Sequence, residues 1–207
     1  KCPIVLSPEL STGLFSSFLS VINGNNIYKK NSFLSDYLNK KVFSSHINIF
    51  EKPNIEEGLG TKPFDGEGVR TFEKPIIEEG ILKTFLLDTY SARHLNSKST
   101  ANSGYTNIFV ESTKEMSSDL IESIDDGILV TEMMGSGANM LTGDYSRGAF
   151  GYLIKKGEVK HPVTNFTIAS NMIDMFNNIE HIGSDYYENS KIKCGSVMIS
   201  DMTIGGS

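Results

Sequence analysis

The residue types that most often bind metals or act as nucleophiles are few and scattered in this chain. No pair among its four histidines has the spacing of a metal-binding motif. These histidines are His46, His94, His161 and His181. The two cysteines, Cys2 and Cys194, make neither a disulfide framework nor a zinc ribbon. We therefore assign no metal ligand in this chain.

Two glycine-rich segments carry polar side chains suited to binding or catalysis. Asp65 and Glu67 could ligate a metal, but they lie among turn glycines without a neighbouring histidine, which favours a loop that contacts a substrate or a partner. Asp144, Ser146 and Arg147 could form a hydrogen-bond network. A serine nucleophile needs a base nearby, and no histidine lies close in sequence. An independent hydrolase at this triplet is kept as an alternative.

Several familiar motifs are absent. The glycines of Gly135–Gly137 lack the spacing of the G-x-S-x-G elbow and of the dinucleotide fingerprint, and no P-loop lysine follows them. Arg93 could hold a carboxylate with its planar guanidinium, although a structural ion pair is the favoured role.

Charge and hydropathy exclude two further classes of protein. The chain has 19 Lys and Arg against 25 Asp and Glu, a net charge of -6, which argues against binding nucleic acid phosphates. No apolar run approaches the roughly 20 residues that span a bilayer, and no secretory signal opens the chain. We expect a cytoplasmic protein with no nucleic acid and no membrane partner.

The elements that position these residues begin with a buried helix. Ser7 suits an N-cap and Pro8 the first helical position, and apolar residues then recur at helical spacing up to Ile22. Asn23 and Gly24 end this helix.

The rest of the pattern predicts short strands, hairpins and helices. In the first half of the chain we expect a helix or turn over 32–38, a strand over 46–51, a long loop over 53–71 and a hairpin over 76–87. A helix over 89–95, capped by Asp88, and a strand over 105–111 follow. In the second half we expect a helix from 117 or 118 to near 127, strands over 128–134, 145–154 and 158–163, a helix over 168–179 and a last strand over 196–204. The hairpins imply an α+β fold, an antiparallel or mixed β-sheet with packed helices, and one domain over residues 1–207.

A set of motifs resembles the C-terminal half of the PmbA/TldD family, the "modulator of DNA gyrase" family of cytoplasmic bacterial metalloproteases, and most of all its PmbA branch, also called TldE. In family order they are NSFL (31–34), GLGTKPFDGEGVRT (58–71), LLDTYSARHLNSKSTANSG (86–104), TEMMGSGANMLTGDYSRGAFG (131–151) and MTIGG (202–206). The resemblance spans nearly the whole chain and implies the fold of that C-terminal domain. It also implies an N-terminal domain upstream, and because Lys1 is not methionine we expect this domain to be absent from the chain.

The first helix separates the two branches of the family. In the TldD branch it carries an HExxxH zinc motif, in which two histidines bind the metal and the glutamate acts as base. Aligned on residues 27–32, the motif positions fall on Ser16, Ser17 and Val21. Because serine and valine cannot replace imidazole on zinc, the resemblance implies no catalytic residue and no cofactor in this chain, with zinc in a TldD-like partner.

The resemblance implies a PmbA/TldE subunit of a zinc metalloprotease that trims peptide precursors and degrades small unfolded proteins. The expected partners are a TldD-like catalytic subunit, in a heterodimer, and a peptide or unfolded protein substrate. The motif residues expected to contact substrate or the subunit interface are Gly66, Glu67, Gly68, Ser91, Arg93, Ser99, Thr100, Asn102, Gly143, Asp144, Ser146 and Arg147. The alternative from another class is a non-enzymatic module that binds peptides or proteins.

Overall fold

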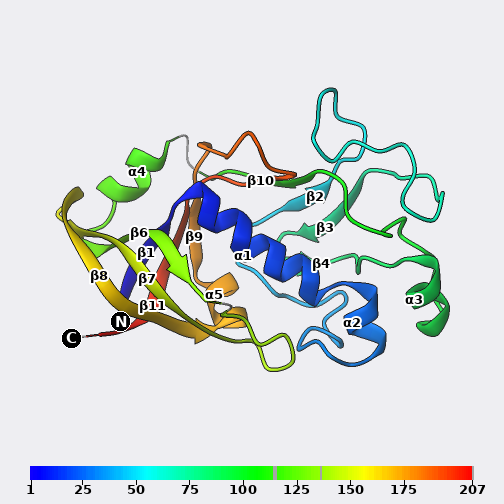
Figure 1. The fold of residues 1–207 in the computed structure, drawn as a ribbon, viewed down its shortest axis with the longest axis horizontal. Helices are drawn as coiled ribbons and strands as arrows, with labels where there is room; N and C mark the ends of the chain where they lie inside the picture. Colours follow the sequence, from blue (N-terminus) through cyan, green and yellow to red (C-terminus); the bar gives the residue numbers. More distant parts are fainter. Residues whose placement is uncertain (114–115, 136, 207) are drawn as a thin grey trace.

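The computed structural model describes residues 1–113, 116–135 and 137–206. Helix α1 (Pro8–Val21) runs across the molecule, with one group of strands near its start and a second group near its end (Figure 1). The strands form a six-stranded and a five-stranded sheet within the described residues, here called the larger and the smaller sheet. The predicted α+β class is confirmed. None of the described helices is long and apolar enough to cross a membrane.

Helix α1 forms where the apolar spacing predicts it. It begins at Pro8, whose missing N–H is not needed in the first turn. Ser7 is extended and makes no side-chain capping bond, but its carbonyl accepts hydrogen bonds from the amide and the hydroxyl of Ser11 at 2.9 and 3.0 Å. The buried face of α1 therefore starts at Ser11 and continues through Phe15 and Phe18.

The larger sheet is mixed and closes on itself. Its strands in spatial order are β1 (Cys2–Leu6), β6 (Asp126–Met134), β7 (Asp144–Lys155), β8 (Glu158–Asn171), β11 (Val197–Gly205) and β9 (Ile179–Ile182). Strand β1 is parallel to β6 and antiparallel to β11, so β1, β6, β7, β8 and β11 form a closed circuit of paired strands. Closure removes most free edges from this sheet.

Strand β1 was not expected from the sequence. Ile4 and Leu6 belong to the main core, whereas Val5 packs on the opposite face in a second small cluster with Leu120 of α4 (Ser117–Glu122). Because both faces of β1 are covered, its sequence is a short continuous apolar run without the polar alternation of a half-buried strand.

The smaller sheet holds a hairpin with the predicted turn, but its strands begin at Lys74 and end at Leu82 instead of spanning 76–87. Its strands in spatial order are β10 (Ile192–Lys193), β5 (Ile108–Val110), β2 (Ile49–Glu51), β3 (Lys74–Glu78) and β4 (Ile81–Leu82). Glu79 and Gly80 form the two-residue loop between β3 and β4, with φ values of 50° and 76°. Positive φ at both positions is typical of the type I′ turns that suit the twist of a hairpin.

The C-terminal helix is shorter than expected. Strand β8 extends to Asn171 because its last residues pair with both β7 and β11, and only α5 (Met172–Asn177) is helical. The predicted helix over 168–179 is therefore wrong in its first four residues and in its last two, because Asn178 is the C-cap of α5 and Ile179 begins β9. Asn171 caps α5 by accepting a hydrogen bond from the amide of Ile173 at 3.0 Å.

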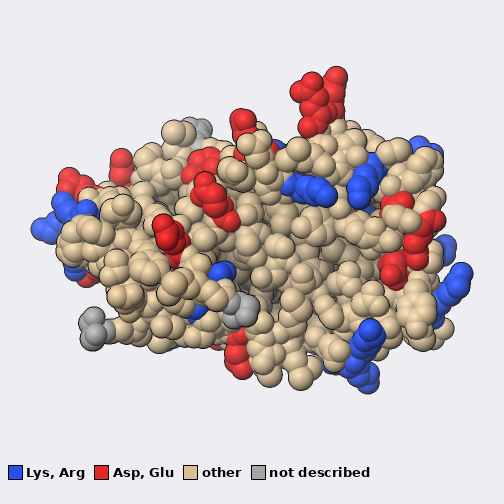
Figure 2. Space-filling view, viewed as in Figure 1, with Lys and Arg blue, Asp and Glu red and all other residues tan. Residues whose placement is uncertain are grey.

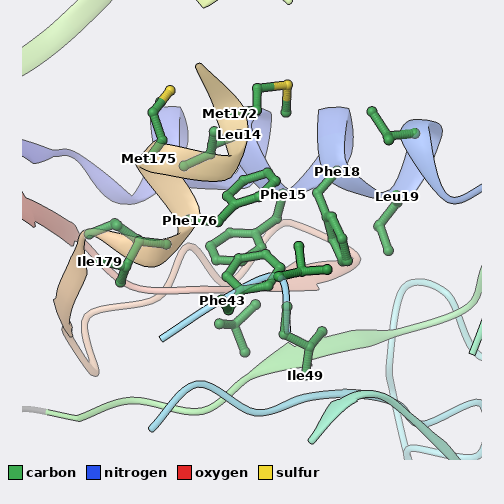
Figure 3. Packing of buried hydrophobic residues seen from close by; sticks show 14 of the residues in the cluster. Leu14, Phe15, Phe18, Leu19, Phe43, Ile49, Met172, Met175, Phe176 and Ile179 are labelled. Carbon is green, nitrogen blue, oxygen red and sulfur yellow. The ribbon is translucent and has the colours of Figure 1, made fainter. Parts of the chain in front are cut away.

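The core joins both sheets through aromatic rings (Figure 3). Phe18 of α1 meets Phe43 and Phe176 edge to face, at centroid distances of 5.0 and 5.5 Å. Phe43 stacks on Phe176 of α5 at 4.4 Å. Since these rings come from distant parts of the chain, their packing fixes α1 against both halves of the molecule.

Candidate substrate groove along helix α1

The three positions aligned with the HExxxH motif lie on α1 and do not fit a zinc ion. Val21 is fully buried in the core. The Ser17 hydroxyl donates to the Gly13 carbonyl at 3.0 Å, and Ser16 offers a single hydroxyl. Within the described residues, no group of three or more His, Cys, Asp and Glu side chains could hold a metal. These positions have neither the imidazoles nor the carboxylates that zinc requires.

Two clefts lie along α1 and share Tyr105 in their linings, and together they are here called the α1 groove. The first, ≈ 290 Å³, lies beside the end of the helix and is lined by Leu19, Ser20, Asn23, Asn26, Leu86, Asn102, Gly104 and Tyr105. The second, ≈ 410 Å³, lies beside its start and is lined by Thr12, Gly13, Ser16, Tyr105, Asn189, Ser190, Lys191 and Ile192. The groove thus passes Ser16, which aligns with the first histidine of the HExxxH motif.

The α1 groove is nearly free of charge. Among the described residues that line it, Lys191 is the one charged side chain. Figure 2 shows largely uncharged surface over the central part of α1, with most Lys, Arg, Asp and Glu nearer the periphery. Amide and hydroxyl side chains both donate and accept hydrogen bonds, so this lining suits the alternating N–H and C=O groups of an extended peptide.

A buried polar cluster fixes the floor of the groove. The Glu51 carboxylate, fully buried at the end of β2, pairs with Lys74 of β3 at 2.7 Å. It also accepts hydrogen bonds from the Asn102 amide at 2.9 Å and from the backbone N–H and hydroxyl of Thr106 at 2.6 and 2.8 Å. Thr100 completes the cluster by donating to Asn102 Oδ1 at 2.8 Å. Asn102 is thus held rigidly where it lines the groove.

The glycine-rich loop over 53–71 is attached to the same floor through Asp65. The Asp65 carboxylate accepts hydrogen bonds from the backbone amides of Glu67, Val69 and Ser103 at 2.9, 2.9 and 3.1 Å. Burial of this carboxylate raises its pKa, but the three amides and the Lys74 cation outweigh burial and hold the pKa below its usual value. Asp65 therefore joins the two segments as an anion.

The predicted site residues of this loop lie close to the segment over 99–104. The Gly66 amide donates to the Ser103 carbonyl at 3.4 Å, and a Cβ at Gly66 would lie 2.8 Å from Ser103 Oγ. Gly68 has a φ of +79°. Glu67 accepts a hydrogen bond from the Thr89 amide at 2.8 Å, at the start of α3 (Thr89–His94). The loop is therefore positioned by its contacts to Ser103 and to the start of α3.

Helix α3 places two predicted residues differently. Ser91 is buried, donates to its N-cap Asp88 at 2.6 Å and lies so close to Gly24 that a Cβ there would clash. Arg93 is exposed, and no ion pair joins it to another described residue, so the structural ion pair favoured from the sequence is not found. Ser91 thus holds α3 against α2 (Gly24–Tyr28), while Arg93 lies on the exposed side of α3.

The third predicted group, Gly143–Arg147, lies at the start of β7. Gly143 has a φ of +81°, and its carbonyl accepts from the Met172 amide at 2.7 Å. Asp144 accepts from the Thr142 hydroxyl at 2.7 Å. Ser146 is exposed, and in the described part of the chain no hydrogen bond joins it to a histidine. Among the described residues, no histidine is therefore hydrogen-bonded to Ser146 as the general base of the alternative hydrolase would be.

The loop before β7 contacts the groove through α2. The Phe33 amide donates to the Met140 carbonyl at 3.0 Å, and the Asn26 amide, which lines the groove, contacts the Met140 sulfur at 3.8 Å. The Arg147 side chain lies against Gly137, where a Cβ would overlap its Cγ at 2.0 Å. Ser136, predicted in this loop, lies outside the described residues. The Gly143–Arg147 group is thus linked to the groove without lining it.

Sequence reasoning missed Glu51, Lys74 and Tyr105. A signal for Glu51 was present, since Ile47, Ile49 and Glu51 occupy one face at a period of two, and both isoleucines are fully buried. Nothing in the sequence pairs Glu51 with a lysine 23 positions later.

Cys194 was left unassigned, and burial raises the pKa of its thiol well above the usual value, with a smaller contribution from Asp185.

The fold and groove define a domain class that comparison with known proteins identifies. The family model "PmbA/TldA metallopeptidase C-terminal domain" matches residues 1–206, and the chain belongs to this family. A curated relative, the metalloprotease PmbA homolog of Buchnera aphidicola from Acyrthosiphon pisum, is 43% identical over 208 residues, which cover 100% of this chain and 47% of the relative.

Solved structures agree with this assignment. A "modulator of DNA gyrase" from Bacteroides thetaiotaomicron superposes with a TM-score of 0.96 at 32% identity, covering 100% of this chain and 47% of that one. TldE from Thermococcus kodakarensis superposes with a TM-score of 0.86 at 25% identity, covering 99% and 50%. The chain spans about half the length of the relatives it matches.

Proposed function

We propose that this chain is the C-terminal domain of a PmbA/TldE-type subunit that binds substrate and supports assembly of a cytoplasmic zinc metalloprotease. The observation that carries the proposal is the set Ser16, Ser17 and Val21, which stands where the catalytic branch has HExxxH and provides no zinc ligand. Zinc and the water that it activates belong to a TldD-like partner in a heterodimer.

In this proposal the α1 groove holds an extended peptide or an unfolded segment of a protein. Its lining, in which Lys191 is the one charged side chain among the described residues, contacts the peptide backbone rather than particular charged side chains, which fits a protease that trims precursors and degrades unfolded chains. The floor anchored by Glu51 and Asp65 keeps the groove in one shape, so that less conformational entropy is lost on binding.

The test is to measure zinc content and peptide cleavage for the full-length protein, alone and mixed with a TldD-like chain from the same source. We expect zinc and cleavage only in the mixture, together with a stable heterodimer by light scattering. Stoichiometric zinc and cleavage by the protein alone would contradict the proposal. A protein that binds peptide but never associates with the TldD-like chain would favour the non-enzymatic binding module instead.

A further inference from the structure

A cavity of ≈ 410 Å³ lies between α2, the end of α3 and the segment over 83–87 that follows β4. Its wall is mainly apolar and is built by Ile27, Phe85, Leu87 and Leu95. Most of this wall is buried, with Ile27 3% and Leu87 4% exposed. The volume and the lining are those of a pocket for a small ligand or for one large side chain. The proposed function leaves this cavity without a role.

The cavity and the groove share one thin layer of residues. Leu86 lines the groove and Leu87 lines the cavity, and likewise Asn102 lines the groove and Thr100 the cavity. The Leu87 amide donates to Thr100 Oγ1 at 2.7 Å, and Thr100 in turn donates to Asn102 at 2.8 Å. A ligand in the cavity would therefore contact residues that hold the groove floor.

The polar groups of the cavity point to the kind of ligand. Lys83 is the one charged side chain among the described residues that line it, and at a distance of 3.5 Å it pairs with Glu78, which is 53% exposed. Two residues with hydroxyl side chains, Ser35 and Ser97, also line the cavity, and the Ser35 hydroxyl donates to the Ser32 carbonyl at 2.8 Å. A single cation beside an apolar wall favours an apolar group that carries a carboxylate, and the hydroxyls suit the amide groups of a peptide more than a bare acyl chain.

We propose that this cavity binds the free C-terminal end of a peptide whose last residue is large and apolar. The last side chain fills the apolar wall, and the terminal carboxylate contacts Lys83 and displaces Glu78 from it. The inference rests on the proposed function in that peptides are the ligands of this domain. It adds a second site, distinct from the groove, that recognises peptide ends.

The test measures binding of N-acetyl-Gly-Phe to the full-length protein by isothermal titration calorimetry, without the TldD-like chain. The matched ligand is the same peptide with a C-terminal amide, which we expect to bind about tenfold more weakly because the contact to Lys83 is charge-assisted. Lys83→Gln should weaken binding of the free acid by a similar factor and leave the amide unaffected. Glu78→Gln should strengthen binding of the acid, since it removes the competing carboxylate.

The control is Lys160→Gln, which removes a lysine that also pairs with a neighbouring glutamate but lies on the distant β7–β8 hairpin. It should leave binding unchanged. Equal binding of acid and amide, or an unchanged affinity in Lys83→Gln, would overturn the inference, as would binding of decanoate but not of the peptide. Because neither zinc nor the partner takes part, these outcomes do not depend on whether the heterodimer forms.

Discussion

At the scale of single residues, the buried pair of Glu51 and Lys74 makes the strongest prediction. Both side chains are at most 5% exposed, so the loss of one charge leaves the other buried without an ionic partner. Glu51→Gln should lower the free energy of unfolding by about 3–5 kcal/mol, measured by urea denaturation. The matched variant Glu158→Gln breaks an exposed pair with Lys160 and should leave the unfolding midpoint nearly unchanged.

A double variant tests the cause of that loss. Replacing Glu51 and Lys74 together by methionine removes both charges, and stability should recover part of the loss seen in Glu51→Gln. If the double variant is less stable than the single one, hydrogen bonds to Asn102 and Thr106 contribute more than the ion pair does.

Asp65 predicts a specific dependence of stability on pH. Its pKa is lower in the folded protein than in the unfolded chain, so its contribution is fully present above the usual aspartate pKa of about 3.9 and is lost as pH falls through the folded value. Asp65→Asn should be less stable at neutral pH and should lose less stability than the wild type below about pH 4. Urea midpoints measured from pH 7 to pH 3 test this, and parallel profiles for the two proteins would contradict it.

The sequence revealed the candidate site only where it contains local patterns. Gly66–Gly68 and Ser99–Asn102 were found as motif segments, and the structure brings them to one floor. The residues that join them, Glu51 and Lys74, were missed because they lie on two different strands that are far apart in the sequence. Long-range polar pairs leave no periodic signal in the sequence.

At the scale of elements, two glycines predict opposite effects of the same change. A Cβ at Gly151 of β7 would lie 2.0 Å from the Leu129 carbonyl oxygen on β6, so Gly151→Ala should destabilise by about 1–3 kcal/mol through overpacking. Gly13 of α1 has nothing within 4 Å of that position, and Gly13→Ala should stabilise by about 0.5–1 kcal/mol because alanine favours the helix. Thermal unfolding of both variants tests the contrast, and the same sign of effect in both would contradict it.

The elements were predictable where one periodicity dominated. Helix α1 was found from its apolar spacing, and α3 from its cap Asp88, which accepts from the Ser91 amide at 2.7 Å. The end of β8 was assigned to a helix because apolar residues on either side of Asn171 also fit helical spacing. Pairing with β7 and β11 overrides that local pattern, and Asn171 turns the chain into α5.

At the scale of the whole molecule, α1 connects the two sheets and also forms one wall of the groove. Its aromatic face packs against Phe43 and Phe176, while its opposite polar face carries Ser16 and Ser20 toward the clefts. Two of the positions that align with the HExxxH motif, Ser16 and Ser17, thus carry hydroxyls on this helix. In the proposed function, this polar face is the one that contacts the substrate.

That arrangement makes the last prediction, which concerns the assembled protease. Ser16→Tyr places a large ring in the α1 groove without touching the buried face of the helix, so it should obstruct an extended peptide. We expect KM for peptide cleavage by the mixture with the TldD-like chain to rise at least about tenfold, equivalent to about 1.4 kcal/mol of lost binding free energy, with the heterodimer intact. Ser17→Tyr is the matched control, because Ser17 lies on the same helix but does not line the groove. Unchanged kinetics in Ser16→Tyr would show that the substrate does not occupy the groove of this subunit, and the proposed division of labour would then keep assembly as the role of this chain.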